Sequence, residues 1–206
     1  MFAADSELRK GNYAFKNECI SYELEDKTLG LVGLGRIGLD VAVKCKLGFR
    51  MNVIAYDPYA QKEIAEEHGI KLVDTLGEVL EQSDFVSLHL PLTERTKEII
   101  GINEFKKMKK TAFLINCARG AVVDENALID ALNNNKIGGA GLDVFTQEPP
   151  ETGNSLLQMS NVVVTPHNSS LTVDGKIKMA VYAVEQLLKV LRGDKADFVV
   201  NKEVLG

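Results

Sequence analysis

Three glycines with a fixed spacing are the first residues of this sequence whose arrangement could do chemistry. Gly33, Gly35 and Gly38 form a GxGxxG pattern between an apolar run and a segment with helical periodicity. In that position the first glycine permits a tight turn, the second lets the main chain approach a pyrophosphate, and the third lets helix and strand lie close together. Amide groups at the start of the helix can then bind the anion. The pattern predicts a dinucleotide-binding loop.

An acidic residue follows the predicted loop at the spacing of a ribose-binding carboxylate. Asp57 ends a predicted strand 19 positions after Gly38, a spacing typical of carboxylates that bind the ribose hydroxyls of NAD. The alternative interpretation of Asp57 and Pro58 is a simple turn initiator. Positions 58 to 61 hold no Arg or Lys that could neutralise the 2′-phosphate of NADP, and Lys62 is the first candidate. We therefore expect NAD to be preferred by about tenfold to hundredfold.

Polar side chains with complementary chemistry follow three later predicted strands. Arg119 comes after the fifth, Glu148 lies beyond the sixth, and His167 follows the seventh. Ligands of an open parallel sheet bind outside the carboxyl ends of its strands, so these groups should meet near the glycine loop. An arginine to bind an oxyanion, a histidine to donate a proton and a glutamate to hold the histidine suit the reduction of a carbonyl.

Each of these residues also has a structural interpretation. Arg119 could be a surface residue before a turn, Glu148 could solvate a loop, and His167 could be an ordinary histidine after a proline. Their joint occurrence at consecutive strand ends favours the functional interpretation. Asp143 closes the sixth strand at the same edge.

Other reactive side chains are expected to be structural. His68 ends a helix, and His89 ends the fourth strand, where it should shape the pocket rather than catalyse. Cys117 lies near the predicted site without a local base, so we interpret it as a small packing residue rather than a nucleophile. With Cys19 and Cys45 it makes three cysteines without CxxC spacing, and neither a disulfide framework nor a metal site is expected.

The hydrophobic pattern supplies the elements that must position these groups. Strands are expected at 29–34, 51–56, 71–73, 84–89, 112–116, 139–143 and 161–165. Helices are expected at 37–49, 61–67, 103–109, 125–133, 155–159 and 173–191. A further helix should begin at Leu76, after an N-cap at Asp74 or Thr75. This alternation is typical of βα units on a parallel sheet. It predicts a Rossmann-type, doubly wound, three-layer α/β/α fold, preceded by an approach helix and linker.

Composition excludes several classes of protein. The 206 residues are 45% hydrophobic and carry a net charge of -5, which suits a globular chain and argues against a nucleic-acid or membrane-surface partner. The one dense basic run, at 106–110, is interpreted as a solvated helix end. No run of 18 apolar residues and no signal peptide is visible, so we expect no membrane contact and a cytoplasmic location.

These motifs together resemble a known family. The residues that carry the resemblance are 28–38 (TLGLVGLGRIG), 89–93 (HLPLT) with Thr96, 115–120 (INCARG) followed by Val123 and Asp124, 141–144 (GLDV) with Glu148 and Pro149, and 165–167 (TPH). They closely resemble the D-isomer-specific 2-hydroxyacid dehydrogenases, and the phosphoglycerate dehydrogenase and hydroxypyruvate reductase branch looks nearest. The resemblance covers about residues 11 to 201. It implies NAD-dependent interconversion of a 2-oxoacid and a D-2-hydroxyacid.

The resemblance also implies roles for single residues. Arg119, Glu148 and His167 would be the catalytic trio, and Asp143 would contact the nicotinamide carboxamide. Arg36 and Ile37 would contribute main-chain contacts to the pyrophosphate. The full set of expected cofactor contacts is Gly33, Gly35, Arg36, Ile37, Gly38, Asp57, His89, Pro91, Thr96, Cys117, Ala118, Arg119, Asp143 and His167.

Two departures from the family pattern matter. Residues 168–170 read Asn-Ser-Ser where the family usually has an apolar residue and a glycine, which bears on substrate choice. Only about 27 residues precede the nucleotide-binding segment, whereas the family builds its substrate domain mainly from residues ahead of it. We therefore expect an interdomain helix and linker at 1–27, the NAD-binding domain at 28–170, and at 171–206 a helix and tail returning toward an absent substrate domain.

A partial chain of this kind has expected properties of its own. It would be a fragment, a proteolysis product or a truncated gene product that binds the cofactor without turnover. A homodimer is expected through the segment 6–15, which offers Leu8, Tyr13 and Phe15.

Two other functions compete with the enzyme interpretation. One is an NAD-sensing, corepressor-like binding protein without turnover, for which no partner-binding motif is visible. The other is a methyltransferase, which would share the glycine loop but leave Arg119, Glu148 and His167 unexplained.

Overall fold

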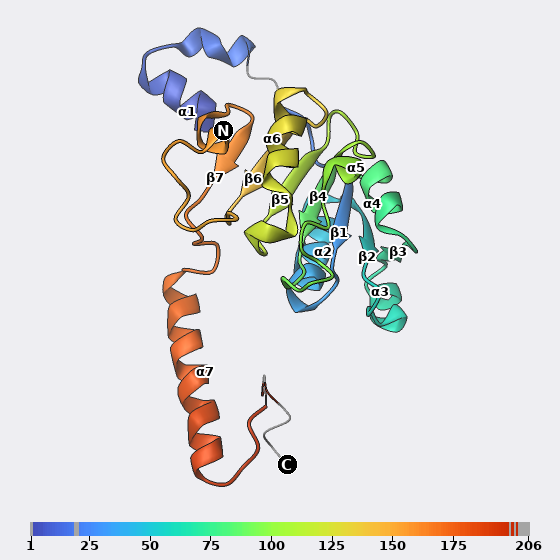
Figure 1. The fold of residues 1–206 in the computed structure, drawn as a ribbon, viewed down its shortest axis with the longest axis vertical. Helices are drawn as coiled ribbons and strands as arrows, with labels where there is room; N and C mark the ends of the chain where they lie inside the picture. Colours follow the sequence, from blue (N-terminus) through green and yellow to red (C-terminus); the bar gives the residue numbers. More distant parts are fainter. Residues whose placement is uncertain (1, 19–20, 198, 200, 202–206) are drawn as a thin grey trace.

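A seven-stranded parallel sheet forms the centre of the protein (Figure 1). The computed structural model describes residues 2–18, 21–197, 199 and 201. The sheet order is β3-β2-β1-β4-β5-β6-β7, so the winding direction reverses between β1 and β4. The strands are β1 (Thr28–Val32), β2 (Asn52–Tyr56), β3 (Lys71–Leu72), β4 (Phe85–Leu88), β5 (Phe113–Asn116), β6 (Gly139–Leu142) and β7 (Val162–Val164). The predicted Rossmann-type, doubly wound α/β fold is confirmed.

Helices lie between successive strands and at both ends of the described chain, and several of them begin at a capping side chain. They are α1 (Phe2–Arg9), η1 (Tyr13–Asn17), α2 (Arg36–Phe49), α3 (Lys62–Glu67), α4 (Leu76–Gln82), α5 (Ile102–Phe105), η2 (Gly120–Val122), α6 (Glu125–Asn133), η3 (Ser155–Gln158) and α7 (Val173–Leu191), where η marks a 3₁₀ helix. Thr75 and Glu78 form a capping box at α4, and Asp124 caps α6 by accepting from the Ala127 N–H. Of the two predicted caps for α4, Thr75 is therefore the one used.

Two hydrophobic cores lie on opposite faces of the sheet. On one face, helices α4, α5 and α6 bury Leu80, Phe105 and Leu128 against β4, β5 and β6. On the other face, Ala42 of α2 and Ala65 of α3 pack against β1 and β2. That second face is only partly covered, because Phe113 of β5 and Val163 of β7 remain exposed on it. The layers therefore sandwich the half of the sheet that carries the glycine loop.

Three predicted helices differ in the structure. The segment 103–109 is helical only as α5, which ends at Phe105, because the chain must turn there to place Met108 in the core and enter β5. The segment 155–159 is the four-residue 3₁₀ helix η3, too short for an α-helical turn pattern. The approach helix predicted at 6–15 is instead α1 and η1, separated at Gly11, whose φ of 85° ends the first helix.

Helix α7 extends away from the sheet (Figure 1). It contains no buried residue, although it presents Ile177, Leu187 and Leu191 among many apolar side chains. Gly193, with a φ of 85°, follows its end. Within the described part of the chain, no helix has the length and apolar character needed to cross a membrane.

Candidate active site

The glycine loop joins β1 to α2 at the point where the sheet order reverses. Gly33 has a φ of 97°, and a Cβ on it would lie 2.4 Å from the carbonyl oxygen of His89. A Cβ on Gly38 would lie 2.4 Å from the carbonyl oxygen of Gly33, whereas a Cβ on Gly35 would meet no atom within 4 Å. The first and third glycines are thus required by the turn and by close contact with the helix. The second leaves open space, as backbone approach to a pyrophosphate requires.

Asp57 is fixed beside this loop by two main-chain hydrogen bonds. Its Oδ2 accepts from the Leu34 N–H at 2.8 Å, and its Oδ1 accepts from the Tyr59 N–H at 2.8 Å. The second bond makes Asp57 a turn residue as well, so the two interpretations of this carboxylate are compatible. Each carboxylate oxygen has two lone pairs, and one on each remains for a ribose hydroxyl. The observed geometry fits a ribose-binding carboxylate.

A cleft of about 870 Å³ opens between the loop, the end of β2 and the segment after β4. Its walls include six of the predicted cofactor contacts: Gly33, Gly35, Asp57, His89, Pro91 and Thr96. Arg36, Ile37 and Gly38 form the first turn of α2, whose N–H groups begin beside the loop. The glycines, the carboxylate and the helix start therefore fit a bound dinucleotide.

His89 shapes this cleft through both its main chain and its ring. Its carbonyl lies against Gly33, and its Nε2 is 2.9 Å from the Ser87 hydroxyl. Burial lowers the pKa of His89, so the ring is neutral at neutral pH. This agrees with the prediction of a pocket-shaping residue.

The loop after β5 presents Arg119 at the same edge. The buried Asn116 side chain holds the loop, because its Nδ2 donates to the Arg119 carbonyl at 2.9 Å and its Oδ1 accepts from the Ala118 N–H at 3.0 Å. The Arg119 guanidinium is exposed and donates from Nη1 to the Ala118 carbonyl at 2.6 Å. A Cβ on Gly120 would lie 2.0 Å from the Phe145 carbonyl carbon, so glycine brings this loop against the one after β6.

Asn116 and Gly120 were not among the predicted site residues. Asn116 could have been identified as a polar residue at the end of an apolar strand, and Gly120 as a glycine directly after Arg119.

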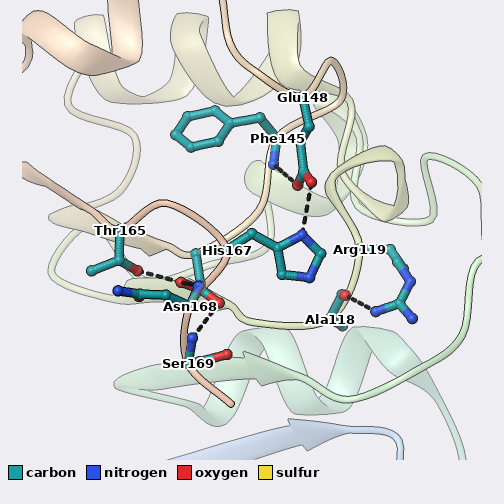
Figure 2. A network of polar contacts seen from close by, with 9 residues as sticks. Ala118, Arg119, Phe145, Glu148, Thr165, His167, Asn168 and Ser169 are labelled. Atoms are coloured by element: carbon teal, nitrogen blue, oxygen red, sulfur yellow. Dashed lines mark hydrogen bonds and ion pairs between the residues drawn. The ribbon is translucent and has the colours of Figure 1, made fainter. Parts of the chain in front are cut away.

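Glu148 and His167 form a hydrogen-bonded pair (Figure 2). His167 Nδ1 lies 2.7 Å from Glu148 Oε2, and Glu148 Oε1 accepts from the Phe145 N–H at 3.1 Å. The bond from His167, followed by the bond from Phe145, lowers the pKa of Glu148. An ionised carboxylate only accepts, so Nδ1 carries a hydrogen, and Nε2 makes no hydrogen bond with the residues that the structure describes.

The main chain of His167 is held in an unusual conformation. Its φ of 49° lies in the left-handed region, which non-glycine residues seldom adopt. The His167 N–H donates to the Asp143 carbonyl at 2.8 Å. Figure 2 shows Glu148 on one side of the imidazole and the Ala118–Arg119 loop on the other. The three predicted catalytic residues thus share one edge, although no hydrogen bond between Arg119 and the other two is present among the described contacts.

Asp143 anchors the turn that carries the histidine. This buried carboxylate accepts from the Thr165 hydroxyl at 2.6 Å, the Asn168 N–H at 2.9 Å and the Ser169 N–H at 3.0 Å. Burial opposes its ionisation, but hydrogen bonds from Ser169, Thr165 and Asn168 outweigh burial and lower the pKa of Asp143 to about 2. Asp143 is therefore charged and positions His167.

Cys117 lies near this site with little nucleophilic character. Partial burial and the nearby charge of Asp143 raise the pKa of the thiol. The raised pKa argues against a nucleophile, but Cys117 is exposed, so the structure does not support the predicted packing role either.

Comparison with known proteins decides the family. Residues 1–169 match the family described as D-isomer specific 2-hydroxyacid dehydrogenase, NAD binding domain. The chain belongs to this family. The predicted resemblance and the NAD cofactor are thereby confirmed.

The similar relatives include two enzymes of the expected branch. The chain is 46% identical over 198 residues to D-3-phosphoglycerate dehydrogenase of Methanocaldococcus jannaschii, a match that covers 96% of this chain and 37% of the relative. It is 44% identical over 183 residues to glyoxylate/hydroxypyruvate reductase B of Cronobacter sakazakii, covering 89% of this chain and 56% of the relative. The chain therefore spans between about a third and somewhat more than half of the length of these two curated relatives.

A solved structure gives the same result. D-lactate dehydrogenase with NAD⁺ from Lactobacillus jensenii superimposes with a TM-score of 0.84 at 34% identity, covering 97% of this chain and 63% of that protein.

Proposed function

We propose that this chain is the cofactor-binding and proton-donating part of an NAD-dependent oxidoreductase that interconverts a 2-oxoacid and a D-2-hydroxyacid. The enzyme is of the phosphoglycerate dehydrogenase or hydroxypyruvate reductase kind, as are the two relatives above. The observation that carries the proposal is the Glu148–His167 pair, with 2.7 Å between carboxylate and imidazole. It lies at the edge of the sheet that also holds the glycine loop and Asp57.

The residues of this edge divide the work of a carbonyl reduction. When bound, NADH supplies the hydride that the 2-oxo carbon accepts. His167 donates a proton from Nε2 to the carbonyl oxygen, which becomes the hydroxyl of the product. Glu148 holds Nδ1 and stabilises the protonated imidazole. In the reverse direction, His167 Nε2 accepts the proton of the substrate hydroxyl.

Arg119 would bind and polarise the substrate. Its guanidinium presents several N–H donors in a planar fork, which suits a carboxylate or a carbonyl oxygen. The observed bond to the Ala118 carbonyl engages only one of them. The exposed side chain can therefore turn toward a substrate beside His167.

The chain organisation is part of the same proposal. Residues 28–170 form the dinucleotide-binding domain, 1–27 serve as an interdomain helix and linker, and 171–206 return toward a substrate-binding domain. The continuous exposed apolar surface of α7 supports this role, because such a surface needs a partner. A cytoplasmic location accompanies the proposal.

We also propose a homodimer. Leu8 and Tyr13 are more than half exposed on α1 and η1, and they offer an apolar contact. Sedimentation at tens of micromolar should show a dimer, and a purely monomeric profile would contradict it.

A turnover assay tests the main proposal. A turnover-competent form of the enzyme that contains this chain should oxidise NADH with hydroxypyruvate or another 2-oxoacid and form the D-2-hydroxyacid. Absence of NADH oxidation across a panel of 2-oxoacids, together with intact NADH binding, would contradict it.

A further inference from the structure

The rim of the cofactor cleft holds a cation that sequence spacing does not reveal. Arg95 Nη1 donates to the Tyr59 hydroxyl oxygen at 3.3 Å. The two residues are 36 positions apart and come from the segments after β4 and β2. Both are exposed and both line the 870 Å³ cleft, so their contact joins two parts of its lining.

Tyr59 also connects this arginine to the ribose-binding carboxylate. The Tyr59 N–H donates to Asp57 Oδ1 at 2.8 Å, so its main chain is fixed at the carboxylate while its ring extends to the guanidinium. Tyr59 therefore links the two charged residues: its main chain contacts Asp57 and its side chain contacts Arg95. The other charged group of its segment that lines the cleft is Glu94.

We propose that Arg95 is a cofactor-specificity residue whose guanidinium binds the 2′-phosphate of NADP and so moderates the discrimination that Asp57 imposes. This inference rests on the dinucleotide-dependent function proposed above. A guanidinium binds phosphate through parallel N–H bonds, which are stronger than a bond to a neutral hydroxyl. The phosphate can thus replace Tyr59 as the partner of Arg95. With NAD, which lacks that phosphate, Arg95 stays on Tyr59.

The two charges on the cleft walls then act in opposite directions. Asp57 favours ribose hydroxyls and repels a phosphate, whereas Arg95 attracts it. NADPH should therefore bind measurably, and the preference for NADH should depend on both residues.

Titrations that follow the fluorescence of NADH and NADPH test this assignment in the 206-residue chain. Arg95→Met should raise the ratio of the NADPH to the NADH dissociation constant by about fivefold to tenfold, almost entirely through weaker NADPH binding. Lys97→Met is the matched control, since it removes a cation from the same exposed segment without touching the cleft lining, and it should leave the ratio unchanged.

Tyr59→Phe tests whether the charge of Arg95 or its hydrogen bond to the Tyr59 hydroxyl matters for specificity. It keeps the ring and removes the hydroxyl, so the arginine remains available and the ratio should change by less than about twofold. Competition by 2′,5′-ADP should weaken in Arg95→Met, while competition by 5′-AMP should not. Thermal melts of each variant check that the fold is retained.

Two outcomes overturn the assignment. An unchanged ratio in Arg95→Met removes its role in specificity, and equal weakening of both cofactors makes Arg95 a general adenosine contact. Because no substrate is present, these results are independent of whether the proposed turnover occurs. A chain that binds neither dinucleotide contradicts both this assignment and the proposed function.

Discussion

The proposed cofactor cleft and the proposed catalytic edge, which carries Arg119, Glu148 and His167, lie at the same end of the sheet but differ in how firmly their side chains are held. In the cleft, both Asp57 oxygens are held by main-chain N–H groups, and Gly33 rests against His89 on the opposite wall. At the catalytic edge, His167 is held by Glu148, but the exposed Arg119 guanidinium bonds only to its own loop.

The difference separates two requirements of the reaction. Cofactor recognition uses main-chain groups and a carboxylate that the fold of these residues fixes by itself. Substrate orientation needs surfaces that enclose the arginine and the histidine, and the relatives contain much more chain in which to provide them. The following predictions probe each side of this comparison.

The largest effect is expected from His167→Asn in a turnover-competent form. Asparagine can still bond to Glu148 but cannot donate the reaction proton, so turnover should fall about a hundredfold to ten-thousandfold at every pH. Binding of NADH should change much less than turnover, because His167 does not line the cleft that holds Gly33 and Asp57, although the resemblance counts it among the cofactor contacts. Steady-state rates and a parallel NADH titration measure both quantities. A loss confined to NADH binding would argue against a proton donor.

Glu148→Gln should change the pH dependence of turnover more than its maximum. The bond from His167 lowers the pKa of Glu148, so this carboxylate is ionised throughout a neutral assay range. Removing its charge destabilises the protonated imidazole. Turnover should be near normal at low pH, and its decline with rising pH should begin at lower pH. A pH profile identical to that of the unmodified enzyme would mean that the pair does not act together.

Asp57→Asn probes the cofactor side. It removes the repulsion toward a 2′-phosphate, which at a partly exposed site should be about 1 to 3 kcal/mol. The expected tenfold to hundredfold preference for NADH over NADPH should fall to near equality. Asp174→Asn on the exposed helix α7 is a control with the same change of charge. A preference retained in Asp57→Asn would assign specificity to another residue.

The smallest expected effect concerns the anchor of the catalytic turn. The pKa of Asp143 is lowered from 3.8 to about 2, so its contribution to stability is present above pH 3.8 and is lost as the pH falls through about 2. That shift corresponds to about 2 kcal/mol. Asp143→Asn should lower the free energy of unfolding by about this amount at pH 7. It should also make the free energy of unfolding less dependent on pH between pH 4 and 2. Urea unfolding at several pH values measures this free energy. The same pH dependence below pH 4 in the variant and in the unmodified chain would contradict the anchoring role.

Local patterns predicted most of the fold and the cofactor loop. The strands were found within one or two residues, because buried parallel strands are short apolar runs that turn residues interrupt. Gly33 and Asp57 could be proposed as cofactor contacts because such contacts follow a fixed spacing along the chain.

Features that depend on contacts between distant segments were not predicted. Arg95 meets Tyr59 only after β2 and β4 are brought together around β1, and no sequence spacing encodes that contact. The left-handed φ of His167 likewise results from its bond to the Asp143 carbonyl. The apolar periodicity of α7 predicted a helix correctly, and only the family resemblance, which directs this helix toward a substrate domain, indicated that its described side chains would lie outside the core.

The central proposal is that the residues of this chain bind NADH by themselves but reduce a 2-oxoacid only with further surfaces that enclose Arg119 and His167. One fluorescence and absorbance titration tests it directly. NADH added to the chain should bind with a saturable change in fluorescence. Hydroxypyruvate and other 2-oxoacids added next should consume it at a rate at least several hundredfold below the ~10 per second of a typical enzyme, because positioning can supply about 7 to 11 kcal/mol of the barrier. Absence of NADH binding, or turnover within about tenfold of that typical rate, would contradict the account.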